Sequence, residues 1–284
     1  MTVICKSTYE SAQNANHAEL VKQYRRTMNL GFKCSPRGQR ILELLNETLT
    51  VSPIAPFNQL PGRNYRLDYF KEEMTWKLGA NKFDDSIKKH AKMWESVQNP
   101  DRTFNSNYGV YWFGPQNGLM TALGALIRDR DSRQAIIPML SSEHLTPQTI
   151  DTVCTEAVGF SIRNSVLYMF VHMRSSDQIF GLGTDIPTFA FLYRLAFGIL
   201  RDYYDDLTIG SISITAMSSH IYERHFDMVS KMDREFEFVV CDIGLDYNMP
   251  WCDAAEALYL IHSRGKKLGR GGELGQWLTV RGEK

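Results

Sequence analysis

Apolar side chains recur at helical spacing in several separate stretches of the chain. Over residues 12–30 and 65–78 they stand three or four positions apart, which is the spacing of one face of an amphipathic helix. The same pattern predicts further helices over residues 86–97, 119–127, 186–200 and 253–262. Because 186–200 is apolar on nearly all sides, we expect this helix in the core.

Shorter stretches rich in β-branched and aromatic residues predict strands. They cover Ile41–Val51 and the ranges 135–140, 157–162, 166–172, 210–217 and 236–240. The two middle stretches, 157–162 and 166–172, are joined by Arg163-Asn164-Ser165, which is the signature of a β-hairpin. After 210–217, the residues Ser218-Ser219-His220-Ile221-Tyr222 are expected to open a helix.

The order of these elements favours one α+β domain. Helices and strands are interspersed without a regular alternation, and neither a repeat nor a linker is evident. We expect a single domain over residues 1–284, with about 33 N-terminal and about 20 C-terminal residues as peripheral extensions. The tail from Arg264 onward is rich in Gly and Lys and is expected to be mobile.

Charge and composition are those of an ordinary globular protein. Lys and Arg total 32, Asp and Glu total 32, and the formal net charge is zero. Bulk attraction to a nucleic-acid duplex or an acidic membrane is therefore not expected, and any anion site must be local. No apolar run reaches the ~18 residues of a membrane span, and no apolar signal segment opens the chain.

The cysteines are odd in number and lack CxxC spacing, so they support neither a metal site nor a disulfide framework. They are Cys5, Cys34, Cys154, Cys241 and Cys252. A reduced, cytoplasmic compartment fits this usage. Most of these thiols are expected to be small buried side chains, and their surroundings must decide whether one is a nucleophile.

Candidate chemistry is concentrated between Cys154 and Asp185. The second strand of the hairpin delivers Arg174, Ser175 and Asp177 in quick succession. A thiol, a cation and two carboxylates on one sheet and the loop leaving it suit a site for an anionic, planar substrate. The alternative is a buried structural thiol among solvated charges.

Other candidates are weaker when taken alone. Glu73 stands among apolar neighbours on a predicted helix, where it is either exposed or an inward-facing proton carrier. Arg37 and Arg40 lie in a Pro- and Gly-containing turn that is either a solvated loop or a phosphate clamp. Arg133 ends a charge cluster that is either a solvated helix terminus or an anion contact. A histidine such as His220 is more often a core residue than a ligand.

Taken together, these motifs resemble the thymidylate synthase superfamily. Cys154 and the motif Arg174-Ser175-x-Asp177, which begins twenty residues later, resemble its catalytic segment. A second site motif and the remaining candidates fall in the family's order: Ser219-His220-Ile221-Tyr222-x-x-His225, Glu73 three before Trp76, Trp94, Tyr108-Gly109 and Asp131-Ser132-Arg133. The resemblance runs from about residue 37 to residue 225. It implies a central mixed β-sheet flanked by helices and a homodimer formed through that sheet.

Within the superfamily, the details resemble the phage deoxycytidylate hydroxymethylases. Asp185 stands where enzymes acting on dUMP carry asparagine. A carboxylate accepts from the amino group of cytosine and holds a proton shared with N3, whereas an amide complements uracil. Mispaired buried polar groups cost about 1–3 kcal/mol each, so Asp185 implies a cytosine nucleotide. Ser175 stands where a related CMP enzyme carries alanine, which favours dCMP.

The resemblance also implies a reaction. Cys154, supported by Arg174, adds to C6 of the pyrimidine, and 5,10-methylenetetrahydrofolate donates a one-carbon unit to C5. Trapping by water yields 5-hydroxymethyl-dCMP, and hydride transfer would instead yield 5-methyl-dCMP. The end of the chain, 279–284, lacks the apolar closing tail of thymidylate synthases, which favours entry of water.

Roles for the remaining residues follow from the same resemblance. Glu73 anchors the proton-transfer network and, with Trp94 and Asp177, contacts the folate. Tyr108 and Asp177 shape the base pocket, and His220 and Tyr222 bind the sugar. The phosphate is held by Arg37 or Arg40, Arg174, Ser175 and Arg133, the last reaching across from the partner subunit. Gln134 replaces the second arginine that usually follows, which is a departure at this clamp.

Three alternatives stay open at this point. The first is a dCMP 5-methyltransferase on the same scaffold. The second is an enzyme specific for dUMP or CMP. The third is a non-catalytic member of the fold that binds nucleotide or RNA, against which the retention of Cys154, Glu73 and Arg174 argues.

Overall fold

A mixed β-sheet organises the protein. The computed structural model describes residues 5–57, 63, 65–234, 248–264, 266, 268–270 and 272–280. Six strands in these ranges form one sheet: β1 Phe32–Cys34, β2 Ile41–Val51, β3 Ile136–Pro138, β4 Thr155–Arg163, β5 Val166–Asp177 and β6 Thr208–Tyr222. Their order is β1-β2-β6-β5-β4-β3, and only the β5–β6 pair is parallel.

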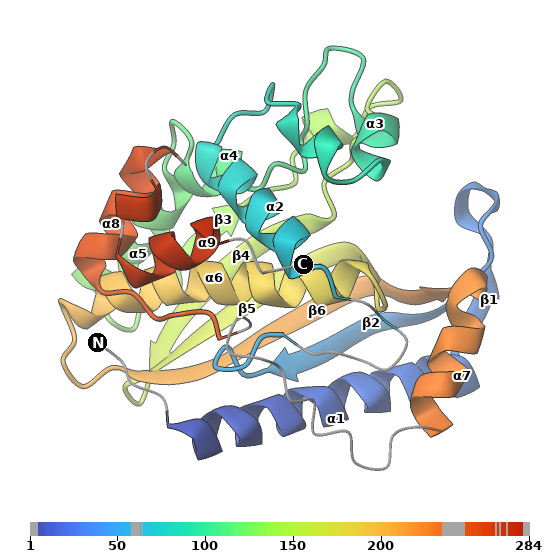
Figure 1. Ribbon diagram of the computed structural model, residues 1–284, viewed down its shortest axis with the longest axis horizontal. Coiled ribbons are helices and arrows are strands. Elements are labelled where there is room, and N and C mark those ends of the chain that lie inside the picture. Colours follow the sequence, from blue (N-terminus) through green and yellow to red (C-terminus); the bar gives the residue numbers. More distant parts are fainter. Residues whose placement is uncertain are drawn as a thin grey trace.

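Helices pack around this sheet (Figure 1). Their bounds are α1 Lys6–Leu30, α2 Leu67–Gly79, α3 Met93–Val97, α4 Gly109–Phe113, α5 Gly118–Arg128, α6 Gly181–Arg201, α7 Phe226–Arg234, α8 Ala254–Ser263 and α9 Glu273–Thr279. In Figure 1, α6 runs along the sheet with α2, α8 and α9 above it, and α1 runs along the lower side next to β2. The expected α+β fold with a central mixed sheet is confirmed.

The core lies between the sheet and α6. Alternate residues of β5 and β6, such as Val171 and Ile214, are buried because strand side chains point to opposite faces in turn. They meet the apolar α6, whose Phe189 and Leu192 are fully buried. This packing fixes the start of α6 against the ends of β5 and β6, where the site residues stand.

The N-terminal helix contributes to the same core. Leu20, Val21 and Tyr24 of α1 are each only 3% exposed. The hydroxyl of Tyr24 donates to the carbonyl of Gln178 over 3.2 Å, just beyond β5. Part of the segment expected to be peripheral is thus packed against the end of the sheet.

The structure corrects three predictions of secondary structure. Residues 218–222 continue β6 and open no helix, because this stretch is paired with β2 and β5 at once. Residues 86–97 form a 3-10 turn and the short α3 in place of one helix. The tail contains α9, whose Trp277 packs against Phe57 at 6.0 Å, so the described part of the tail is ordered by burial. The expected strand 236–240 lies outside the described residues.

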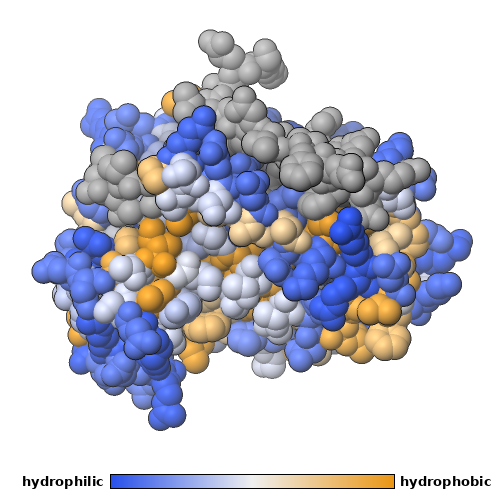
Figure 2. Space-filling model, turned by 90° about the horizontal axis from the view of Figure 1, so that it is seen from below, coloured by the Kyte–Doolittle hydropathy of each residue, from blue (hydrophilic) through white to orange (hydrophobic). Residues whose placement is uncertain are grey.

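One face of the sheet points away from α6. It carries hydroxyl pairs such as Thr48 and Thr215, 2.9 Å apart, beside Phe170 and Met217, which are 39% and 60% exposed. Figure 2, seen from below, shows apolar and weakly polar residues across the middle of this side of the molecule, with hydrophilic residues around them. Exposed rings and methionines on a sheet are typical of a surface that binds another protein chain.

Candidate active site

A cavity of about 610 Å³ lies where α2, the start of α6 and the ends of β5 and β6 converge. It brings together nearly all of the site residues predicted from the sequence: Arg37, Glu73, Trp94, Tyr108, Cys154, Arg174, Ser175, Asp177, Asp185, His220 and Tyr222. These residues come from segments that span most of the chain. Their convergence is what a site, rather than scattered surface charge, requires.

The thiol of Cys154 stands at the end of a loop that Arg174 holds in place. Arg174 Nε donates to the carbonyl of Val153 over 2.9 Å, and Nη2 donates to the carbonyl of Thr152 over 2.7 Å. The same Nη2 lies 3.6 Å from Cys154 Sγ. The cation therefore both shapes the loop and faces the sulfur it would activate.

Burial and charge act on this thiol in opposite directions. Removal from water raises the pKa of Cys154 above its ordinary value, and Arg174 lowers it. Burial is the larger of the two effects, and Asp185 and Asp151 add to it. The predicted lowering by Arg174 is therefore present but outweighed, so the ligand-free protein holds mostly thiol.

A buried carboxylate anchors the other end of the nucleophile loop. Asp151 is 4% exposed, and one oxygen accepts from the backbone N–H of Ser106 over 2.7 Å while the hydroxyl of Ser106 donates to the other. Asn105 Nδ2 donates to the carbonyl of Asp151 over 2.9 Å. Asn99 Oδ1 accepts from the N–H groups of Ile150 and Asp151, each over 2.9 Å. The loop is thus fixed from both sides.

An acidic cluster lines the same cavity as the thiol. Glu73 points inward and is 6% exposed, and its Oε1 lies 2.9 Å from Nζ of Lys77. Its Oε2 is buried without a hydrogen-bond partner among the described residues. Burial raises the pKa of Asp185 to about 7; Lys77 opposes this rise, and Glu73 and Asp177 add to it. Near neutral pH, Asp185 is therefore divided between its acid and its carboxylate.

The parallel pair β5–β6 sets the sugar-binding end that the sequence predicts. Asp177 and His220 are register partners, so both side chains reach the cavity at the same level. Burial lowers the pKa of His220, which keeps its imidazole neutral. The guanidinium of Arg224 lies 3.9 Å from the ring centre of Tyr222, which fixes the orientation of that phenol.

Only one of the two candidate arginines in the first turn faces the cavity. Arg37 lines it and has left-handed backbone angles (φ 51°), followed by Gly38 at φ 75°. A non-glycine residue rarely adopts this conformation, so the turn is shaped to present its arginine. Arg40 is held by an ion pair with Glu223 at 3.2 Å and lies outside the cavity wall.

Arg133, like Arg40, lies outside the cavity wall. Its side chain is exposed in the connection between α5 and β3, and it is not part of the cavity wall of its own chain. Trp94 is in the predicted place: its Nε1 donates to the hydroxyl of Tyr69 over 3.0 Å, and its ring packs on Trp76 at 5.0 Å. The aromatic wall of the cavity is therefore rigid.

Sequence reasoning missed four cations of the wall: Arg63, Arg66, Lys77 and Arg224. Lys77 had a signal, because it stands one helical turn after Glu73 and so shares its face of the helix. Arg63 lies in none of the predicted elements or motifs and had no such signal. A Cβ at Gly183 would lie 1.7 Å from Nη1 of Arg63, so the glycine makes room for this guanidinium.

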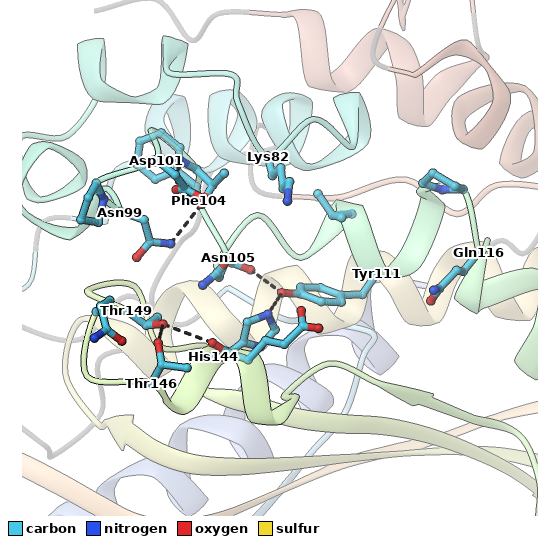
Figure 3. Close-up of a pocket in the computed structure, with 16 residues that line it drawn as sticks. Lys82, Asn99, Asp101, Phe104, Asn105, Tyr111, Gln116, His144, Thr146 and Thr149 are labelled. Atoms are coloured by element: carbon cyan, nitrogen blue, oxygen red, sulfur yellow. Dashed lines mark hydrogen bonds between the residues drawn. The ribbon is translucent and has the colours of Figure 1, made fainter.

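A second hollow, of about 660 Å³, lies beyond the wall that carries Asn105 (Figure 3). Tyr111 donates to the carbonyl of Asn105 over 3.0 Å and lies 3.2 Å from His144 Nε2. Ser141 N–H donates to His144 Nδ1 over 3.2 Å, so the proton of the neutral ring is on Nε2. These groups satisfy one another and support the strip whose next residue, Ser106, lines the active cavity.

The described part of the chain lacks two kinds of feature. None of its helices combines the length and the apolar character that crossing a bilayer requires. No set of three or more His, Cys, Asp or Glu side chains there is grouped as metal ligands would be.

Comparisons with known proteins agree with this geometry. The sequence profile described as thymidylate synthase matches residues 22–248. Deoxycytidylate 5-hydroxymethyltransferase of Enterobacteria phage T2 is 27% identical over 193 residues, covering 65% of this chain and 78% of the relative. The enzyme of the same name from phage T4 is 28% identical, covering 57% and 70%.

A further relative carries a different activity in its name. Thymidylate synthase of Fusobacterium nucleatum is 24% identical over 165 residues, covering 56% of this chain and 58% of the relative. The profile spans the nucleophile, the acidic cluster and the His220–Tyr222 strand end alike. The chain therefore belongs to the thymidylate synthase family and is a one-carbon transferase.

Proposed function

We propose that the protein is a dCMP hydroxymethylase that converts dCMP, 5,10-methylenetetrahydrofolate and water to 5-hydroxymethyl-dCMP and tetrahydrofolate. The observation that carries the proposal is Asp185, a carboxyl with a pKa of about 7 in the same cavity as Cys154 and its arginine. Cytosine offers an acceptor at N3 and a donor at N4. A carboxyl complements both when one oxygen shares a proton with N3 and the other accepts from N4. The names of the phage relatives support the same substrate.

The reaction begins at the thiol. Cys154 adds to C6 as thiolate, and Arg174, whose Nη2 lies 3.6 Å from the sulfur, stabilises the thiolate before it attacks. The C5–C6 electron pair moves into the C4–C5 bond, and the C4–N3 pair takes the proton of Asp185. The base is then an enamine whose C5 is nucleophilic. Glu73, with one buried oxygen unpartnered, is placed to move protons through water as C5 loses its hydrogen.

The cavity fits a folate as co-substrate. When bound, methylenetetrahydrofolate supplies a one-carbon unit for attachment to C5. The indole of Trp94 and the phenol of Tyr69, joined by a hydrogen bond of 3.0 Å, form an aromatic part of the cavity wall. Arg63 and Arg66 line the same cavity and offer positive charge to the folate carboxylates.

For the phosphate of dCMP the cavity offers Arg37, which its left-handed turn presents, together with Ser175 and Arg174. We propose that the site is completed by Arg133 of the partner subunit, in a homodimer formed through the face of the sheet that carries Phe170 and Met217. Free cysteines without a disulfide framework fit a reducing compartment, so we propose the cytoplasm, or that of the host if the protein is phage-encoded.

Product analysis tests the proposal. Purified protein is incubated with dCMP and methylenetetrahydrofolate, and the nucleotide product is identified by mass. A hydroxymethyl group, with tetrahydrofolate as the second product, supports hydroxymethylation. A methyl group with stoichiometric dihydrofolate assigns the chain to dCMP methylation instead. The Cys154→Ala variant is the blank, and tighter binding of dUMP or CMP than of dCMP contradicts the assignment of the base or the sugar.

A further inference from the structure

Lys77 is a buried cation that has no role in the reaction described above. It is 2% exposed and stands on α2, one turn after Glu73. Burying an ammonium group is costly unless it is paired and hydrogen-bonded. Its partners must therefore explain why the site contains it.

The contacts of Lys77 all belong to the acidic side of the cavity. Its Nζ lies 2.9 Å from Glu73 Oε1 and donates to Thr188 Oγ1 over 3.3 Å. The ammonium group lies 5.2 Å from the ring centre of Tyr108. Thr188 lies one turn after Asp185 on α6. Lys77 therefore links α2, which carries Glu73, to α6, which carries Asp185.

Charge balance shows what this cation does. Glu73, Asp185 and Asp177 are the carboxylates on the cavity wall, and Tyr108 and Cys154 are weak acids beside Asp185. Lys77 is paired with Glu73, so its positive charge acts on Asp185 from a distance. It offsets only part of the rise in the pKa of Asp185 that burial causes. Without Lys77, two carboxylates would face each other in a poorly solvated space.

We propose that Lys77 is a positioning residue that holds Glu73 and supplies the positive charge against which Asp185 releases its proton to N3 of cytosine. The proposal rests on the function proposed above. As sulfur bonds to C6, the negative charge of the thiolate is displaced through the ring, and N3 takes the proton. The charge then resides on Asp185. Lys77, a cation held between α2 and α6, stabilises the Asp185 carboxylate that this step forms.

The pH dependence follows from the same arrangement. The productive enzyme holds one proton on the Cys154–Asp185 pair, so kcat/KM rises as pH rises through the pKa of Asp185, which is about 7. Replacing Lys77 by a neutral residue raises the pKa of Asp185 and moves this acid limb to higher pH, by on the order of one pH unit. The titratable groups facing Asp185 remain Glu73, Asp177, Tyr108 and Cys154.

Lys77→Met is the test variant, and Lys77→Gln is the second neutral variant. Lys77→Arg keeps the charge. Lys71→Met is the matched control, since Lys71 is also buried on α2 but donates to the carbonyl of Val280 over 2.9 Å, outside the cavity wall. Circular dichroism verifies the fold of each variant.

Two readouts are used. The first is tritium release from C5 of labelled dCMP, which reports any substitution at C5 whatever the product. The second is the titration midpoint of the Asp185 carboxyl by NMR of protein labelled with carbon-13 aspartate, assigned with Asp185→Asn. The second readout requires no turnover, so it tests Lys77 even if the proposed reaction is wrong.

We expect the acid limb and the NMR midpoint to move together to higher pH in Lys77→Met and Lys77→Gln. Both should stay near the original values in Lys77→Arg and Lys71→Met. An unchanged midpoint in a folded neutral variant overturns the proposal. An equal shift in Lys77→Arg also overturns it, because shape rather than charge would then be responsible.

Discussion

Arg174 Nη2 contacts Cys154 Sγ at 3.6 Å while the rest of its guanidinium binds the loop that carries the thiol. Charge and geometry are thereby supplied by one side chain. Arg174→Gln should raise the pKa of Cys154 further, because the lowering contribution of the cation is lost. The measurement is the pH dependence of alkylation of Cys154, with Cys154→Ala as background.

Arg40→Gln is the control for that experiment, because Arg40 is ion-paired to Glu223 outside the cavity. Its alkylation profile should match the unaltered protein. A midpoint for Arg174→Gln equal to that of Arg40→Gln would show that the arginine does not act on the sulfur.

Base preference should depend on Asp185. Asp185→Asn presents an amide to the base, which complements uracil and mispairs with cytosine. Each mispaired buried group costs about 1–3 kcal/mol, so affinity for dCMP relative to dUMP should fall by about 10- to 100-fold. Calorimetric titration of both nucleotides measures the ratio. An unchanged ratio would remove Asp185 from base recognition.

The carboxyl of Asp185 should also make the free energy of unfolding depend on pH. Burial holds the pKa of Asp185 at about 7, against an ordinary value of 3.8. Between these values the folded state binds one more proton than the unfolded state, so the free energy of unfolding falls as pH rises from about 4 to about 7. The loss amounts to at most about 4 kcal/mol. Urea unfolding at stepped pH should show this slope, and Asp185→Asn should lack that component of it.

The anchor of the nucleophile loop should matter more for turnover than for nucleotide binding. Asp151→Ala removes the acceptor for both Ser106 donors, at a cost of about 1–3 kcal/mol in stability, and frees the loop ahead of Cys154. We expect kcat to fall about tenfold or more, with little change in the Kd of dCMP. Asp101→Ala is the control, since Asp101 accepts from Thr103 in the same pattern on the surface. Equal effects of the two substitutions would contradict a special role for Asp151.

The dimer proposal predicts complementation between two inactive proteins. Arg133→Ala and Cys154→Ala are each expected to be inactive. In a mixed dimer, the chain that retains Cys154 receives an intact Arg133 from the other subunit. Random mixing should therefore restore about a quarter of the activity. Mixtures that stay inactive despite subunit exchange, followed by sedimentation of labelled chains, would place Arg133 outside the partner's site.

The parts of the fold that were predictable are those with local patterns. The 157–162 and 166–172 hairpin and the apolar α6 carry their own periodicity and appear as predicted. The strand end at Tyr222 was mistaken for a helix because its conformation is set by pairing with β2 and β5, which no local pattern reveals.

The site shows the same division. Cys154 and Asp185 were named from their chemistry and from the resemblance to the family, and both line the cavity. Arg63 was not named, because its place depends on Gly183 and Phe180, which lie far away in the sequence. Lys77 was overlooked although it stands one helical turn after Glu73. The choice between Arg37 and Arg40 likewise required the geometry of the turn and the ion pair with Glu223.

The pairing of β2 with β6 has a consequence for how the enzyme matures. The bond between Ser218 and Glu43 joins residues 175 positions apart, and that between Gln23 and Ser219 joins residues 196 apart. Contacts so distant in sequence close late, because the chain entropy they remove must first be offset by nearer contacts. We therefore expect the hairpin next to Cys154 to form before His220 and the N-terminal helix dock. If folding stops before these distant contacts form, the thiol of Cys154 lies next to an incomplete nucleotide site.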